Sequence, residues 1–114
     1  MGYVNVMPSL QVEDLDATVA WYERLIGRAP DRNPMEGCFE WQLADSGGLQ
    51  IYRNPGAATT ATIILGSDDV DAEVDRLRER GIDAETYDVP SGQFRLAQLA
   101  DPAGNTVILS QVLK

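Results

Sequence analysis

The sequence predicts an α+β fold in which one small module is written twice. Residues 14–19 (DLDATV) are echoed by residues 69–74 (DVDAEV), an offset of 55 residues in a chain of 114. Self-similarity at a fixed spacing is the sequence signature of a repeated structural unit. Apolar residues alternate with polar ones before the first copy and recur at helical spacing within both copies. We therefore expect a helix flanked by strands in each half of the chain.

A strand and a helix are predicted to open the first module. Residues 3–12 alternate between apolar and polar side chains, as in a strand with one face toward the core. Asp14 can cap the first helical turn, and Gly27 can adopt the left-handed conformation that ends a helix. The apolar side chains between these two residues predict the buried face of the helix: Leu15, Val19, Tyr22 and Ile26.

A second helix is predicted over the second copy of the repeat. Val70, Val74 and either Leu77 or Arg78 lie at the spacing of a buried helical face, and Gly81 follows as the stop. The acidic residues at the start of this segment suit helix capping. They lack the glycine and the bidentate glutamate spacing of a calcium loop.

The rest of the chain is predicted to form strands joined by turns. In the first module, a loop over residues 28–36 precedes two short segments that flank a Gly-rich turn, which indicates a hairpin. The predicted strands are residues 38–43, 49–52, 60–65, 82–89, 94–100 and 106–112. No linker divides the halves, and neither would bury much core alone. We expect one domain over residues 1–114, with modules of about residues 1–57 and 58–114.

Composition excludes several kinds of chemistry. The chain has no His, so Ser-His catalysis and imidazole metal sites are excluded. Lys114 is its single lysine, which argues against a Schiff-base lysine or a phosphate-loop lysine. Cys38 has no second cysteine to pair with and is expected to be a buried, inert thiol. The net charge of −9 opposes binding to nucleic acid. The apolar runs are too short for a membrane helix, and the start of the chain lacks the pattern of a secretory signal, so we expect a cytoplasmic protein.

Three phrases resemble the vicinal oxygen chelate superfamily, which includes glyoxalase I, extradiol dioxygenases, fosfomycin-resistance enzymes and bleomycin-resistance proteins. They are VEDLDATVAWYERLIG, SDDVDAEVDRLRERGID and LADPAGNTVIL, and they occur in the order of the family over nearly the whole chain. The resemblance implies paired βαβββ modules whose mixed sheet curls into a cup, with a ligand inside and helices outside. It also implies a homodimer, with the modules paired within one chain or swapped between two.

The same resemblance implies where a metal would be held in the enzymes of the family. The corresponding positions of this chain are Met7, Gln50, Thr62 and Ile108. Met7 and Ile108 supply no hard donor, and Gln50 and Thr62 offer neutral oxygens that cannot balance a dication. We therefore expect no metal and no other cofactor. The metal-dependent lyase or dioxygenase activity of the relatives is not expected from these four residues.

Strand parity predicts which side chains line the cup. With a hairpin loop of even length, Trp41 lies across from Tyr52, whereas an odd loop or a bulge brings in Glu40 and Gln42 instead. The predicted ligand-binding residues are Asn5, Met7, Ser9, Trp41, Gln50, Tyr52, Thr62, Gln98 and Ile108, with Leu43 and Thr106 beside them. Apolar and aromatic walls with a few neutral polar groups are typical of a small-molecule pocket. The same side chains could instead fill a collapsed core.

The leading functional hypothesis is a bleomycin-resistance-like protein that binds a small, partly apolar molecule in the cup without a metal, in a sequestration or resistance role. Trp41 and Tyr52 would stack on the ligand, and Gln50 and Gln98 would orient it. The negative net charge favours a cationic compound. One alternative is a small-molecule enzyme of the lyase, isomerase or dioxygenase kind, with Glu40, or another pocket carboxylate with a raised pKa, as its general base. Another is an interaction module with a filled cup.

Overall fold

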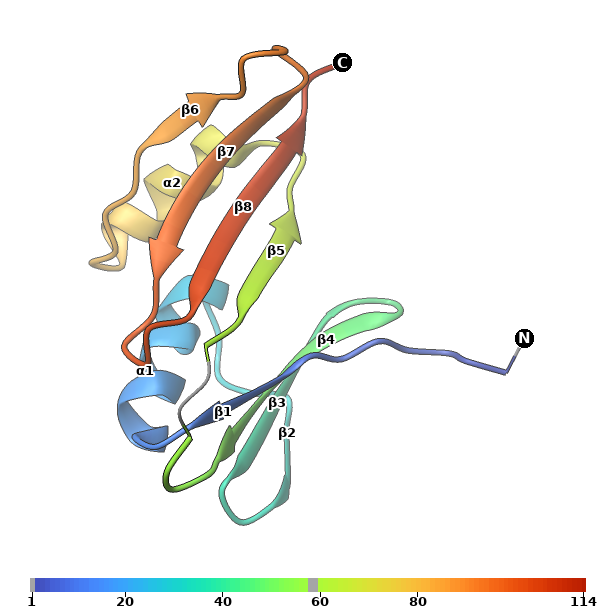
Figure 1. Cartoon of the computed structure of the whole chain (residues 1–114), viewed down its shortest axis with the longest axis vertical. Coiled ribbons are helices and arrows are strands. Elements are labelled where there is room, and N and C mark those ends of the chain that lie inside the picture. The colour runs from blue at the N-terminus through green and yellow to red at the C-terminus, as the bar shows by residue number, and fades with distance from the viewer. Residues whose placement is uncertain (1, 58–59) are drawn as a thin grey trace. The chain divides into compact units, whose positions relative to one another are not determined.

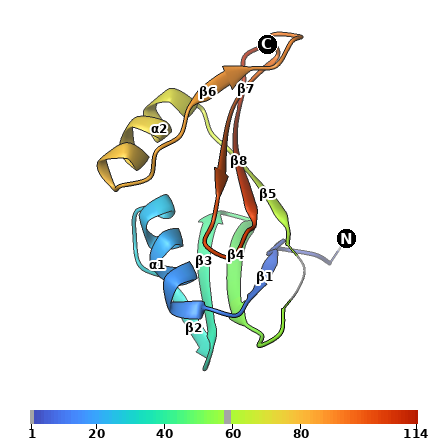
Figure 2. The same ribbon diagram turned by 60° about the vertical axis from the view of Figure 1, so that its left-hand side comes forward.

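The computed structural model describes residues 2–57 and 60–114 and divides into two compact units, residues 1–59 and 60–114. Each unit packs one helix on one face of a four-stranded mixed sheet (Figures 1 and 2). The predicted α+β fold with two tandem modules is therefore confirmed. That both modules make up a single domain stays a prediction. None of the described helices is long and apolar enough to cross a membrane.

Unit 1 is built around a sheet of strand order β1-β4-β3-β2. Strand β1 is parallel to β4, and the other neighbours are antiparallel. Its elements, in chain order, are β1 (Ser9–Val12), α1 (Leu15–Ile26), β2 (Arg32–Met35), β3 (Cys38–Ala44) and β4 (Gly47–Arg53).

The N-terminal segment of unit 1 extends beyond the sheet (Figure 1). Of the strand predicted over residues 3–12, residues 9–12 lie in β1, and Val6 adds an isolated bridge to Gly47. Val4 and Val6, which the alternation assigned to the core face, are 85% and 74% exposed. This part of the prediction is wrong because β4 begins at Gly47, so the residues before Val6 have no neighbouring strand to pair with.

Helix α1 begins and ends as predicted. The Asp14 carboxylate accepts a hydrogen bond from the Ala17 N–H at 3.1 Å, and Gly27 has a φ of 91°. The buried face differs in part from the prediction, because the five buried residues are Leu15, Thr18, Trp21, Tyr22 and Leu25. Spacings of three and four residues both keep helical side chains on one face. The sequence was therefore compatible with two overlapping buried faces, and it did not decide between them.

An edge strand replaces part of the predicted loop over residues 28–36. Strand β2 is exposed throughout and pairs with β3 at Arg32–Glu40 and Met35–Cys38, with a register shift between these pairs. Pro34 fits there because an edge strand does not need every N–H for its ladder. The prediction missed β2 because an exposed four-residue strand has no hydrophobic alternation.

Unit 2 repeats the arrangement with strand order β5-β8-β7-β6, in which β5 is parallel to β8. Its elements are β5 (Thr62–Gly66), α2 (Val70–Glu79), β6 (Thr86–Asp88), β7 (Phe94–Ala100) and β8 (Thr106–Val112). The predicted strands 94–100 and 106–112 agree with β7 and β8 residue for residue. Strand β6 is shorter than the predicted residues 82–89.

Helix α2 is capped by Asp69, whose carboxylate accepts the Ala72 N–H at 3.0 Å. This confirms the capping interpretation for that residue of the acidic cluster. The buried residues of the helix are Val70, Val74 and Leu77. Leu77, rather than the exposed Arg78, therefore completes the buried face.

Candidate functional site

The face of the unit 1 sheet turned away from α1 carries a row of polar side chains. The register places Ser9 beside Gln50, Gln50 beside Glu40, and Glu40 beside Arg32. Side chains of paired residues lie on the same side of a sheet. We call this surface the polar face and define it by six side chains: Ser9, Gln11, Arg32, Glu40, Gln42 and Gln50.

A chain of hydrogen bonds joins these side chains across the four strands of the sheet. Ser9 Oγ donates to Gln50 Oε1 at 2.5 Å, and Gln50 Nε2 donates to Glu40 Oε2 at 2.8 Å. From the opposite side, Arg32 Nε donates to Glu40 Oε1 at 2.9 Å. Gln11 Nε2 donates to Ser9 Oγ at 3.1 Å. The Glu40 carboxylate is therefore the acceptor on which both halves of the chain converge.

Further contacts extend the chain at both ends. Arg32 Nη2 donates to Gln42 Oε1 at 3.2 Å, and Gln42 Nε2 donates to Asn5 Oδ1 at 3.3 Å. At the other end, Asn54 Nδ2 donates to Gln11 Oε1 at 3.3 Å. These contacts hold the amides of Gln11, Gln42 and Gln50 in fixed orientations, because each of the three uses its oxygen as an acceptor and its nitrogen as a donor.

A bulge in the hairpin decides which residues of β3 reach the polar face. The pairing shifts between Gln42 and Ala44, and Glu40 lies opposite Gln50. This is the arrangement that the sequence left open for an odd loop or a bulge. The alternative with Trp41 opposite Tyr52 is wrong.

Trp41 lies on the opposite side of the sheet, in the core of unit 1. Its side chain is fully buried, and its ring centroid lies 6.4 Å from that of Tyr22 on α1. The indole Nε1 donates to the Arg28 carbonyl at 3.0 Å. The prediction that Trp41 lines a ligand pocket and stacks on the ligand is therefore not supported, because successive strand residues point to opposite faces.

Glu40 is held as an anion on the polar face. Its side chain is 15% exposed, against 44% for Arg32. The hydrogen bond from Arg32, followed by that from Gln50, lowers the pKa of Glu40, because both bonds favour the charged carboxylate. Burial acts in the opposite direction and is the smaller effect. The enzyme alternative requires a general base with a raised pKa, and the pKa of Glu40 is shifted in the opposite direction.

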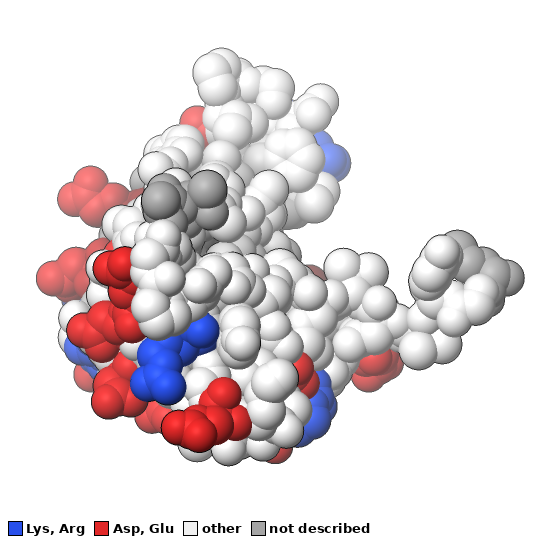
Figure 3. Space-filling model, turned by 60° about the horizontal axis from the view of Figure 1, so that its bottom comes forward, with Lys and Arg blue, Asp and Glu red and all other residues white. Residues whose placement is uncertain are grey.

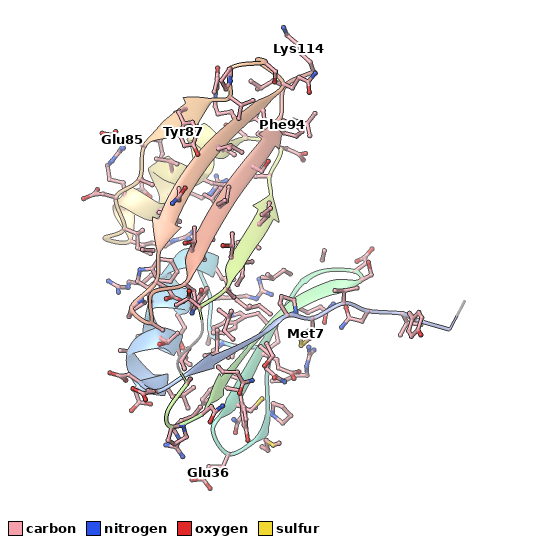
Figure 4. The ribbon with its side chains drawn as sticks, viewed as in Figure 1. Met7, Glu36, Glu85, Tyr87, Phe94 and Lys114 are labelled. Atoms are coloured by element: carbon pink, nitrogen blue, oxygen red, sulfur yellow. The ribbon has the colours of Figure 1, made fainter. Side chains whose placement is uncertain are left out.

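Met7 lies against the sheet at Gly48. A Cβ added to Gly48 would meet Met7 Cε at 2.7 Å and the Trp41 carbonyl oxygen at 2.6 Å. Figure 4 labels Met7 on the segment that leads into β1. The absence of a side chain at Gly48 is therefore what allows Met7 to approach β4.

The face of the unit 2 sheet turned away from α2 is mostly apolar. Ile64 and Val112 are each 67% exposed, and Tyr87 and Phe94 are 49% and 38% exposed. Tyr87 lies on β6 and Phe94 at the start of β7 (Figure 4). We call this surface the apolar face and define it by six side chains: Ile64, Tyr87, Phe94, Leu96, Ile108 and Val112.

The predicted site residues divide between the two units. Ser9 and Gln50 belong to the polar face, Asn5 bonds to it through Gln42, and Tyr52 is paired with Gln11. In unit 2, the register aligns Gln98 with Ile108 and Thr62 with Thr106 on the face that carries the apolar residues. Leu43 lies at the bulge. A ligand-binding role for these residues stays a prediction.

Sequence reasoning missed two members of the polar face. Gln11 shares the parity of Ser9 and could have been found by the same alternation. Arg32 could not, because its strand was interpreted as a loop.

Among residues 2–57 and 60–114, no group of three His, Cys, Asp or Glu side chains lies close enough to hold a metal ion. Gln50, one of the four positions at which the family resemblance would place a metal ligand, uses both amide atoms in contacts with Ser9 and Glu40.

Acidic side chains gather on the surface shown in Figure 3, with basic side chains among them. A cavity of about 370 Å³ at the start of α1 is lined by Glu13, Asp14, Leu15, Asp16 and Arg53. Two of these carboxylates serve the local backbone: Asp14 caps α1, and Glu13 accepts the Gly56 N–H at 2.9 Å.

Comparison with known proteins decides the family. A family model for the Glyoxalase/Bleomycin resistance protein/Dioxygenase superfamily matches residues 2–109. The chain belongs to this superfamily. A search of curated proteins finds no match.

Solved structures of the superfamily share the fold. A glyoxalase/bleomycin resistance protein from Catenulispora acidiphila has a TM-score of 0.87 and 31% identity, covering 96% of this chain and 98% of that one. A bleomycin-binding protein complexed with bleomycin has a TM-score of 0.75 and 26% identity, covering 94% and 97%. An antibiotic-binding protein from a Streptomyces species has a TM-score of 0.73 and 27% identity, covering 98% of both chains.

Proposed function

We propose that this superfamily member binds a small, partly apolar organic molecule on the polar face of unit 1 without a metal, in a sequestration or resistance role. The observation that carries the proposal is the hydrogen-bonded chain through Ser9, Gln50 and Glu40 on a face that no helix of unit 1 covers. Polar side chains fixed in orientation at a surface are suited to recognising a ligand, because their donors and acceptors need no rearrangement on binding.

The apolar face of unit 2 is, by itself, a second surface suited to the apolar groups of a ligand. Large side chains such as Ile64, Tyr87 and Phe94 are exposed there. Contiguous exposed apolar surface commonly marks a site of interaction. Aromatic rings add stacking surface at low cost in conformational entropy.

The relatives support the same class of function. One solved relative is a bleomycin-binding protein in complex with bleomycin, and another is an antibiotic-binding protein. For the enzyme alternative, the pKa of Glu40 is lowered rather than raised, which does not favour this residue as the general base. Homodimer formation and a cytoplasmic location stay predictions, and size-exclusion chromatography with light scattering tests the first of these.

Isothermal titration calorimetry with bleomycin and a panel of cationic and neutral antibiotics tests the proposal. We expect at least one compound to bind, with the same affinity after EDTA treatment as after exposure to Mg²⁺, Mn²⁺, Ni²⁺ or Zn²⁺. Binding that requires a metal ion, or no binding across the panel, would refute the proposal.

A matched pair of variants locates the site on the polar face. Gln50→Ala removes the contacts to Ser9 and Glu40 and is expected to weaken binding about tenfold, equivalent to about 1.4 kcal/mol for lost and unsatisfied hydrogen bonds. Gln93→Ala changes an exposed glutamine of unit 2 before β7 and should leave the affinity unchanged. Equal affinities for the two variants would place the site elsewhere.

A further inference from the structure

The polar face differs in local charge from the chain as a whole. The chain carries a net charge of −9. Of the six side chains that define the polar face, Arg32 carries one positive charge and Glu40 one negative charge, and the two form an ion pair at 2.9 Å. The face therefore presents neither an unpaired anion nor an unpaired cation to a ligand.

The ion pair retains hydrogen-bonding capacity after its protein contacts are made. Each Glu40 oxygen accepts one hydrogen bond from the described residues, and a carboxylate oxygen can accept two. Arg32 uses Nε with Glu40 and Nη2 with Gln42, while a guanidinium offers five N–H donors. Arg32 thus keeps N–H donors, and Glu40 keeps acceptor positions, within one ion pair.

The complement of such a pair is a group with its own acceptor and donor side by side. A primary carboxamide or a lactam has this arrangement, because its C=O can accept from Arg32 while its N–H donates to Glu40. An amidinium offers donors alone, and a carboxylate offers acceptors alone. Each would satisfy one member of the pair and leave the other facing a like charge.

We propose that the polar face selects an uncharged carboxamide or lactam group and that Arg32, by neutralising Glu40, is the residue that sets this selectivity. The inference rests on the proposed function and adds the chemical class of ligand that this face accepts. It also separates two electrostatic effects. The net charge of the chain attracts cations from a distance, whereas the paired charges at the polar face decide which head group binds there.

Three small probes with one shared body test the proposal. Benzamide, benzamidinium and benzoate each combine a phenyl ring with a planar head group, and they differ in charge. Their binding to ¹⁵N-labelled protein is followed through the side-chain amide resonances of Gln42 and Gln50, which contact Arg32 and Glu40 respectively. For the wild-type chain we expect benzamide to bind at least threefold tighter than either charged probe.

Charge-neutralising variants then predict reciprocal changes. Arg32→Gln leaves the Glu40 carboxylate unpaired and should raise the affinity for benzamidinium at least threefold. Glu40→Gln leaves Arg32 unpaired and should do the same for benzoate. The double variant R32Q/E40Q removes both charges and should restore the preference for benzamide. Well-dispersed ¹⁵N spectra verify that each variant is folded.

A control separates local pairing from net charge. Arg76 forms an exposed ion pair with Glu73 on α2, and Arg76→Gln changes the net charge by the same amount as Arg32→Gln. It should leave the order of the three probes unchanged. A wild-type preference for benzamidinium, or an equal effect of R76Q and R32Q, would overturn this inference while leaving the antibiotic titrations as the separate test of small-molecule binding. Absence of any shift at Gln42 and Gln50 with all three probes would also overturn it.

Discussion

Substituting alanine at two adjacent glycines of β4 gives a sharp test of the packing at the polar face. At Gly48 an added Cβ would lie 2.6 Å from the Trp41 carbonyl oxygen and 2.7 Å from Met7 Cε. Backbone cannot yield as a flexible side chain can, so Gly48→Ala should cost about 1–3 kcal/mol through overpacking. Replacing glycine by alanine also lowers the conformational entropy of the unfolded chain, which stabilises the folded state by about 0.4–1 kcal/mol. We expect the free energy of unfolding to fall by roughly 1–2 kcal/mol.

Gly47 is the matched control for this prediction. An added Cβ at Gly47 meets nothing within 4 Å, so Gly47→Ala should leave the stability unchanged or raise it by up to about 1 kcal/mol. The measurement is urea unfolding followed by far-UV circular dichroism, with the midpoints compared at constant m-value. The double variant M7A/G48A should recover part of the loss, because it relieves the contact with Met7 and leaves that with the Trp41 carbonyl. Equal midpoints for G47A and G48A would refute the reasoning.

Three further predictions concern single side chains. Because Arg32 lowers the pKa of Glu40 below its usual value of 4.5, this carboxylate stabilises the fold above that pH, and its contribution is lost as the pH falls through the lower folded value. Urea midpoints measured from pH 7 to pH 3 should therefore fall less steeply for Glu40→Gln, and parallel curves would contradict this. Trp41→Phe should lower the free energy of unfolding by about 1–3 kcal/mol, through lost volume and the lost bond to Arg28, while benzamide binding is unchanged. Unfolding of Asp69→Ala should require about 1 kcal/mol less than wild type, with Asp69→Ser recovering most of the difference, since a cap needs only a side-chain acceptor.

Only part of the candidate site could be derived from the sequence. Alternation identified Ser9, and the family resemblance drew attention to Gln50, both of which lie in the hydrogen-bonded chain. Trp41 was assigned to the wrong side because side-chain parity has meaning only relative to a known register. Arg32 was not predicted to belong to the site, because its short, exposed edge strand has no hydrophobic pattern that would identify it as a strand.

By itself, the sequence determined the two-module order, the N-terminal caps of both helices, the C-terminal cap of α1 and the bounds of β7 and β8. These features depend on local chemistry: a carboxylate at a helix start, a glycine at the end of α1, and turn residues that bound the strands. Tertiary structure alone decided which residues meet on the polar face. The bulge before Ala44 places Glu40 beside Gln50, and the pairing of β2 with β3 brings Arg32 to Glu40; the contact of Arg32 with Glu40 sets the charge state of the face. A shift of one residue in either pairing would have turned different side chains outward.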